Sequence, residues 1–158
     1  MEQAQKVVKT KRTIKRDYTY AVGRRKEAVA RVRLYTHVKE GHVFGSEKVV
    51  KDQMLVNEMP IEKYFPGPIA KSHYTQPFSV TNTIGKFAVT VKVAGGGRNG
   101  QLDAMIQGLA RALSKIDTIK YRKLLKTKGL LTRDSRARQR RQVGMGGKSR
   151  RKKQSPKR

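Results

Sequence analysis

The chain has 158 residues, with 38 Lys or Arg against 11 Asp or Glu, and a formal net charge of +27. It contains no cysteine, which excludes disulfides and thiolate-bound metals, and no apolar run approaches the roughly twenty residues needed to cross a bilayer. The charge is uneven: residues 1–16 carry a net +5, residues 17–119 carry +6 and residues 120–158 carry +16. We therefore expect a basic N-terminal extension (1–17), a globular domain (18–131) and an extended basic tail (132–158).

The N-terminal extension does not have the pattern of a secretory signal. Six basic residues between Lys6 and Arg16 interrupt the hydrophobic segment that such a signal requires. A short transit peptide is an alternative, because the segment is rich in basic residues and poor in acids. A bacterial cytosolic or an organelle-encoded protein explains the same composition equally well.

The first predicted strand covers residues 27–35. Alternation places four apolar residues on one face and Val29, Arg31, Arg33 and Tyr35 on the other. The first face can enter a core, while the second shows two guanidinium groups and an aromatic ring. The preceding segment 23–27 is predicted to be a basic turn that grips phosphates, or else an ordinary exposed turn.

The middle of the chain is predicted to mix short strands and helices. Residues 36–52 favour a hairpin or an irregular excursion, followed by a strand at 54–56. Pro60 suits the first turn of a brief helix over 61–65, and a further helical segment is predicted over 68–74. Residues 78–80 and 87–93 are predicted to be paired strands around a turn at 83–86.

From Gly100 onward the apolar period becomes helical. One stripe recurs every three or four residues and consists of Leu102, Met105, Ile106, Leu109, Leu113 and Ile116. A second helix is predicted over 118–126, with Gly129 placed to end it. Strands followed by helices predict the α+β class, with a single antiparallel or mixed sheet and helices packed on one face.

The glycine-rich segment 95–101 lies between a strand and a helix start, as phosphate loops do. A P-loop needs Gly-Lys-Ser/Thr at its end, whereas Gln101 and Leu102 follow Gly100 here, and the Rossmann spacing also fails. We predict a tight crossover whose glycines adopt positive φ. Arg98, at the exposed helix start, remains available to an RNA phosphate.

No catalytic or metal centre is predicted. His37, His42 and His73 lack metal-ligand spacing, and no nucleophile has a plausible base beside it. Asp134 is expected to pair with a neighbouring arginine or to cap a turn. The sequence therefore predicts no enzyme activity, no metal and no cofactor.

The C-terminal segment is the strongest functional signal. Residues 120–158 hold seventeen basic side chains and one acid, and ionised groups at this density need the counter-charges that a nucleic acid supplies. A solvated charge run or a nuclear localisation patch is the alternative. We expect the tail to be disordered when free and ordered against its partner. The residues expected to contact phosphates are the basic ones of the turn, the strand, the helix start and the tail: Arg24, Arg25, Lys26, Arg31, Arg33, Arg98, Arg133, Arg136, Arg138, Arg140, Arg141, Lys148, Arg150, Arg151, Lys152 and Lys153.

Six segments and the terminal pair occur in a recognisable order: Tyr20–Val32, Val56-Asn57, Pro60–Phe65, Val93–Gly97, Gly108–Leu113, Gly129–Asp134 and Lys157-Arg158. Together they resemble the bacterial-type family of the ninth protein of the small ribosomal subunit. The resemblance covers nearly the whole chain from Tyr18. Basic composition alone does not produce it.

The resemblance implies a structural protein of the subunit head that binds small-subunit rRNA, in cytoplasmic rather than organelle ribosomes. It implies a left-handed βαβ crossover like that of the second domain of ribosomal protein five, although most crossovers are right-handed. The expected neighbours are the seventh, tenth and fourteenth small-subunit proteins. The tail would reach peptidyl-site tRNA, with Lys157 and Arg158 on phosphates of the anticodon stem-loop; no membrane or small-molecule partner is implied.

The chain departs from the family in two places. The family usually ends with an aromatic residue before Ser-Lys-Arg, whereas segment 154–158 lacks the aromatic and contains Pro156. The stretch between Tyr35 and Gln53 is also longer than usual. Two other functions stay open from the residues alone: a DNA-compacting protein, which would bind duplex DNA as well as RNA, and a small nucleotide enzyme resting on segment 95–100.

Overall fold

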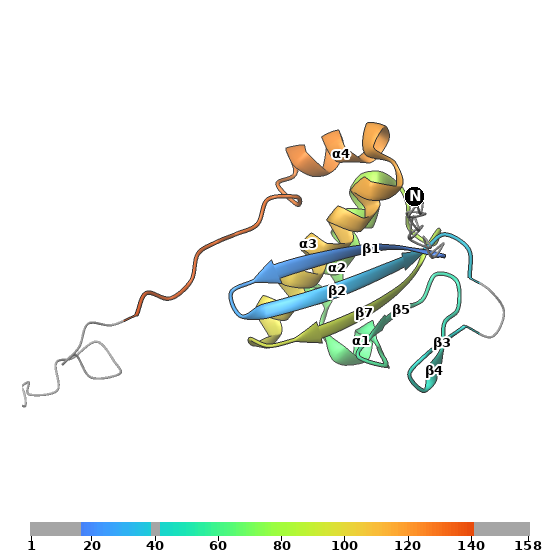
Figure 1. Cartoon of the computed structure of the whole chain (residues 1–158), viewed down its shortest axis with the longest axis horizontal. Coiled ribbons are helices and arrows are strands. Elements are labelled where there is room, and N and C mark those ends of the chain that lie inside the picture. Colours follow the sequence, from blue (N-terminus) through green and yellow to red (C-terminus); the bar gives the residue numbers. More distant parts are fainter. Residues whose placement is uncertain (1–16, 39–41, 141–158) are drawn as a thin grey trace, which may run out of the picture.

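The structure is a computed structural model that describes residues 17–38 and 42–140. Five strands form one mixed sheet in the order β1-β2-β7-β5-β6 (Figure 1). All neighbours in this sheet are antiparallel except β5 and β7, which are parallel. The strands of the sheet are β1 (Tyr18–Arg25), β2 (Ala28–Tyr35), β5 (Met54–Val56), β6 (Met59–Pro60) and β7 (Ala88–Ala94). A separate hairpin consists of β3 (Val43–Phe44) and β4 (Glu47–Lys48).

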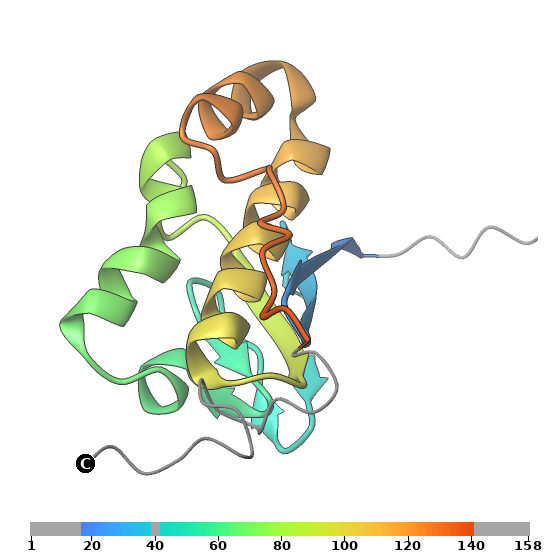
Figure 2. The same ribbon diagram turned by 90° about the vertical axis from the view of Figure 1, so that its left-hand side faces the viewer.

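Helices cover one face of the sheet (Figures 1 and 2). They are α1 (Ile61–Tyr64), α2 (Pro68–Thr81), α3 (Arg98–Ile116) and α4 (Thr118–Thr127). Helix α3 packs on β1 and β2 because its apolar stripe faces them, and Met105, Leu109 and Leu113 are completely buried. Burial of each such side chain contributes on the order of 2 kcal/mol. These residues meet the inward faces of β2 and β7 in the main core.

The opposite face of the sheet is covered at one end only. Tyr35, Leu55 and Ala88 point to this face and form a second core with Phe44 of the β3–β4 hairpin and Val49. The hairpin therefore closes the part of this face where β2 ends and β7 begins. None of the described helices lies over the remainder of this face, across β1, β2 and β7 (Figure 1).

The outer edge of β1 is tied to α3 by side chains four residues apart. Lys115 donates to Tyr20 O (2.8 Å), Arg111 donates to Val22 O (3.0 Å), and the Arg24 amide donates to the Gln107 Oε1 (2.9 Å). Four helical residues rise about 6 Å and two strand residues about 6.7 Å, so the two repeats match. These three occupied backbone groups make the β1 edge less open to pairing with a further strand.

Close contact between β1 and α3 depends on Gly23 and Gly108. A Cβ on Gly23 would lie 1.9 Å from Ala104 O, and one on Gly108 would lie 2.7 Å from a Val32 methyl group. Glycine is required at both positions because the strand and the helix touch backbone to backbone. Gly23 is thus a buried strand residue, not part of the predicted turn; the turn is at Lys26 (φ 50°) and Glu27.

Two predictions about local structure are wrong. No strand was predicted before residue 27, yet β1 begins at Tyr18, because its inward residues Ala21 and Gly23 are too small to give an apolar signal. Residues 78–80 belong to α2 and not to a strand. The helix continues through Pro77 because Tyr74, Pro77, Phe78 and Thr81 bury a common side at helical spacing.

A third prediction is wrong for one side chain. Tyr35 was expected on an exposed face with Arg31 and Arg33, but it is only 3% exposed because the β3–β4 hairpin covers it. Other predicted elements are confirmed: the strands at 54–56 and 87–93, the hairpin within 36–52, the brief helix after Pro60 and both C-terminal helices. The crossover glycines Gly95 and Gly96 adopt φ of 74° and 62°, as expected.

Candidate nucleic-acid interface

Basic and aromatic side chains line up across three strands on the face away from the helices. Each row follows from the strand register: β1 pairs with β2, and β2 pairs with β7. One row is Tyr20, Arg33 and Thr90, and the next is Val22, Arg31 and Lys92. A third row is Arg24, Val29 and Ala94. We call the residues Arg24, Arg31, Arg33 and Lys92 the sheet-face cations.

The sheet-face cations surround a hollow of about 510 Å³. The described residues that line it include the four cations, Tyr18, Tyr20 and Phe44, and none of these described lining residues is acidic. Within residues 17–38 and 42–140, no carboxylate pairs with any of the four cations. Like charges without a counter-ion raise the local positive potential, which favours an anionic partner.

Aromatic rings hold two of these cations in place. The Arg33 guanidinium lies 5.0 Å from the centre of the Tyr18 ring, and the Lys92 ammonium lies 5.6 Å from that of Phe44. A cation–π contact orients the cation without neutralising it. The net charge of Arg33 and Lys92 therefore remains available to phosphate groups.

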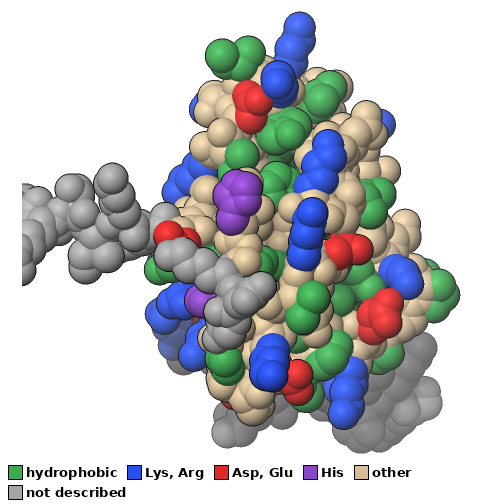
Figure 3. Space-filling view, turned by 90° about the vertical axis from the view of Figure 1, so that its right-hand side faces the viewer, with side chains coloured by type: hydrophobic (Ala, Val, Ile, Leu, Met, Phe, Trp, Pro, Cys, Tyr) green, Lys and Arg blue, Asp and Glu red, His purple; other side chains and the backbone are tan. Residues whose placement is uncertain are grey.

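Another part of the surface has a different character. At the end of the molecule seen in Figure 3, Lys and Arg side chains are interspersed with Asp, Glu and hydrophobic side chains. Mixed charges of this kind are typical of an ordinary solvated surface. The contrast singles out the sheet-face cations as the candidate interface on the domain.

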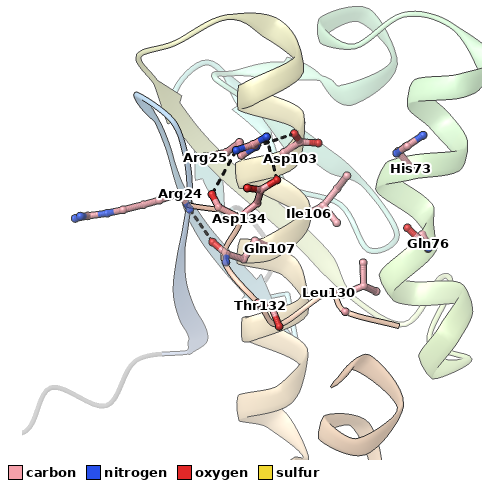
Figure 4. Close-up of a pocket in the computed structure, with 11 residues that line it drawn as sticks. Arg24, Arg25, His73, Gln76, Asp103, Ile106, Gln107, Leu130, Thr132 and Asp134 are labelled. Atoms are coloured by element: carbon pink, nitrogen blue, oxygen red, sulfur yellow. Dashed lines mark hydrogen bonds and ion pairs between the residues drawn. The ribbon is translucent and has the colours of Figure 1, made fainter. Parts of the chain in front are cut away.

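Arg24 and Arg25 were predicted together but lie on opposite faces of β1 (Figure 4). Arg24 is exposed and extends away from α3, on the side of the sheet-face cations. Arg25 points toward α3, and its side chain is only 14% exposed. It pairs with Asp103 (3.5 Å) and Asp134 (3.0 Å), so its charge is neutralised by carboxylates of the protein itself.

Lys26 in the β1–β2 turn and Arg98 at the start of α3 are both exposed. A Cβ on Gly95 would lie 2.5 Å from Glu27 O, so the β1–β2 turn touches the loop that leads into α3. Lys26 belongs to the turn and Arg98 is the first residue of α3. The structure thus brings these two predicted residues to one end of the sheet.

The start of the tail carries four predicted residues, Arg133, Arg136, Arg138 and Arg140, all of which are exposed. Asp134 accepts hydrogen bonds from the Arg136 amide (2.9 Å) and guanidinium (2.7 Å), as predicted for a local pair. These hydrogen bonds hold the pKa of the Asp134 carboxyl well below its usual range. A lowered pKa keeps this carboxylate ionised, so the pair persists until the pH falls through that lowered value.

Several predicted residues lie outside the described part of the chain: Arg141, Lys148, Arg150, Arg151, Lys152, Lys153, Lys157 and Arg158. The N-terminal extension falls there too, except for Asp17. In the described part, sequence reasoning missed Lys92. Its position between Val91 and Val93 in an alternating strand was the available signal, since a charged residue there must face away from the helices.

Comparisons with known proteins identify the family of the chain. A family described as "Ribosomal protein S9/S16" matches residues 23–158. The chain belongs to the ribosomal protein S9/S16 family. The small ribosomal subunit protein uS9 of Maridesulfovibrio salexigens is 42% identical over 132 residues, which cover 84% of this chain and 91% of the relative. The uS9 protein of Solidesulfovibrio magneticus is 41% identical over 131 residues, covering 83% and 90%.

Membership of the S9/S16 family confirms the resemblance stated from the sequence. The chain is a structural protein of the small ribosomal subunit and not an enzyme. The α+β class with a mixed sheet is likewise confirmed. None of the described helices is long and apolar enough to span a membrane.

Proposed function

We propose that this S9/S16 protein binds small-subunit rRNA with the open face of its sheet and continues along the RNA with its basic tail. The observation that carries the proposal is the set of four sheet-face cations without carboxylate partners in the described residues. Phosphate oxygens supply the missing counter-charges, and release of counterions from RNA drives the association. The tyrosines beside the cations offer surfaces for unpaired bases.

The proposed rRNA contacts fall into two groups. The first comprises the domain residues Arg24, Lys26, Arg31, Arg33, Lys92 and Arg98, all of which are exposed. The second is the basic tail from Arg133 to Lys153, which would neutralise phosphates inside the subunit. On this proposal the chain is divided as predicted, into an N-terminal extension (1–17), an RNA-binding domain (18–131) and a tail (132–158).

The proposal places the domain on the subunit head of a cytoplasmic ribosome. The seventh, tenth and fourteenth small-subunit proteins are its proposed neighbours. The β5–β7 connection, which runs through α1 and α2 between two parallel strands, is proposed to have the left-handed form implied by the resemblance. Family membership supports these points.

Sedimentation of the tagged full-length chain tests the proposal. We expect the chain to co-sediment with small subunits from its source cells and to remain bound in high salt. Appearance in nucleoid fractions with loss from ribosomes would instead indicate a DNA-compacting protein. High salt is informative because purely non-specific binding weakens steeply with ionic strength.

Deletion of Lys157 and Arg158 tests the proposed contact with peptidyl-site tRNA. We expect the affinity of isolated small subunits for this tRNA to fall several-fold in ~0.1 M salt, because two phosphate contacts are lost. Subunit assembly should stay unchanged, since the bulk of the tail remains. Filter binding over a salt series provides the measurement, and an unaltered affinity at every salt concentration would contradict the tRNA role.

A further inference from the structure

Arg25 is held by four groups of the protein, and three of them lie near the start of the tail. Its guanidinium pairs with the Asp134 carboxylate (3.0 Å) and donates to the backbone oxygens of Asp134 (3.4 Å) and Arg136 (2.7 Å). The fourth group is the carboxylate of Asp103 on α3 (3.5 Å). Figure 4 shows Arg25 reaching between Asp103 and Asp134.

Residues around this contact fix it to the body of the domain. The Arg24 amide donates to Gln107, which is 6% exposed, so β1 and α3 are joined one residue away from Arg25. Asp134 also binds the amide and the guanidinium of Arg136. The backbone between Asp134 and Arg136 is therefore held at both ends, although it forms neither helix nor strand.

This arrangement explains why an acidic residue occurs in the basic tail. Asp134 is the one acid among the last 39 residues, and an acid in a phosphate-binding tail opposes RNA binding. The Asp134 carboxylate anchors the tail to Arg25, and this anchoring compensates for its repulsion of phosphate groups. Arg25, in turn, is too enclosed and too well paired to serve as a free phosphate ligand.

We propose that Arg25 and Asp134 form a latch that fixes the direction in which the tail leaves the domain, so that Arg25 is a positioning residue and not a phosphate contact. The inference rests on the proposed rRNA-binding function. Holding the first tail residues before RNA arrives lowers the entropy that must be lost on binding. The latch thereby aligns residues from Ala137 onward with the RNA.

Distance measurements on the free full-length chain test the latch directly. The chain has no cysteine, so Ser79→Cys and Ala137→Cys create a unique pair for spin labels on α2 and the tail start. We expect a narrow distance distribution that broadens in Arg25→Lys, because one ammonium cannot bridge two carboxylates and two carbonyls. Arg24→Lys, the matched control on the open face, should leave it narrow.

RNA binding by Asp134→Ala separates the latch from simple electrostatics. This variant is more basic than the wild type, so charge alone predicts tighter binding to a small-subunit rRNA fragment. The latch predicts the opposite, a loss of about tenfold, because the tail start must be ordered on binding. Asp52→Asn, a remote exposed carboxylate, controls for the added charge and should not weaken binding.

The distance measurement and the RNA-binding measurement test separate parts of the proposal. A broad distribution in the wild-type background, or no broadening in Arg25→Lys, overturns the latch whether or not the chain binds RNA. Equal or tighter RNA binding by Asp134→Ala overturns its role in RNA binding. If no variant binds RNA, the wild type included, the proposed function is refuted. The latch is still tested in that case, because the distance measurement contains no RNA.

Discussion

Replacement of Gly23 by alanine is expected to lower the unfolding midpoint of the full-length chain by roughly 15 °C or more, because overpacking at a buried contact costs about 3 kcal/mol in a domain of this size. The added Cβ would lie 1.9 Å from Ala104 O and 2.5 Å from Gly108 N, both backbone atoms of α3. A helix backbone cannot yield as a flexible side chain does. The whole of α3 must therefore move away from β1. This movement strains the hydrogen bonds that join Gln107, Arg111 and Lys115 to the strand edge.

Gly100→Ala is the matched control for this variant. A Cβ there would meet its nearest atoms at 3.7 Å and 3.8 Å, ordinary packing distances. Because Gly100 lies in the first turn of α3, alanine should stabilise the helix by about 0.4–1 kcal/mol. Thermal unfolding followed by circular dichroism compares the two variants, and a Gly23→Ala midpoint equal to that of the wild type would show that β1 and α3 are not in backbone contact.

The parts of the fold that were predictable are those with large apolar side chains at regular spacing. The stripe from Leu102 to Ile116 predicted α3 because six bulky residues recur on one side of the helix. The β7 strand was predictable for the same reason, since Val89, Val91 and Val93 alternate. In both cases the sequence signal and the burial in the structure come from the same atoms.

The parts that were not predictable depend on small residues or on distant contacts. β1 buries Ala21 and Gly23, which carry almost no hydrophobic signal, so its strand pattern was hidden. In α2, residues 78–80 were predicted to be a strand, whereas tertiary packing of Tyr74 and Phe78 continues the helix to Thr81. Tyr35 was misplaced because strand alternation does not reveal that the β3–β4 hairpin, which follows β2 in the chain, folds back over this end of the face.

The candidate site shows the same division. Arg31 and Arg33 could be placed on a common exposed face because β2 was recognised as a strand. The opposite orientations of Arg24 and Arg25 could not be predicted, because they follow from β1, which was not recognised as a strand (Figure 4). The pairing of Arg25 with Asp103 and Asp134 joins three segments far apart in the chain, and no local pattern encodes it.

Neutralisation of the sheet-face cations is expected to cause the largest loss of RNA binding. In a chain carrying Arg24→Gln, Arg31→Gln, Arg33→Gln and Lys92→Gln, the slope of log affinity against log salt should decrease in magnitude by about 3, since each phosphate contact contributes roughly 0.7–0.9. The corresponding loss of affinity in ~0.1 M salt is on the order of 1,000-fold. Glutamine keeps much of each aliphatic stem, and the exposed positions of all four residues leave the cores intact. Electrophoretic mobility shifts with a small-subunit rRNA fragment, over a range of salt concentrations, measure both quantities.

A second quadruple variant tests whether RNA binding depends on the position of the sheet-face cations or only on the number of positive charges. Lys48, Lys51, Lys63 and Lys86 are also exposed but do not line the hollow on the sheet face, and their replacement by glutamine removes the same total charge. Because phosphate contacts act over distances near the Debye length of about 10 Å, charges away from the bound RNA should change the slope by less than 1. Equal losses in the two variants would mean that the chain attracts RNA by its overall charge, and that the open face of the sheet has no special part in binding.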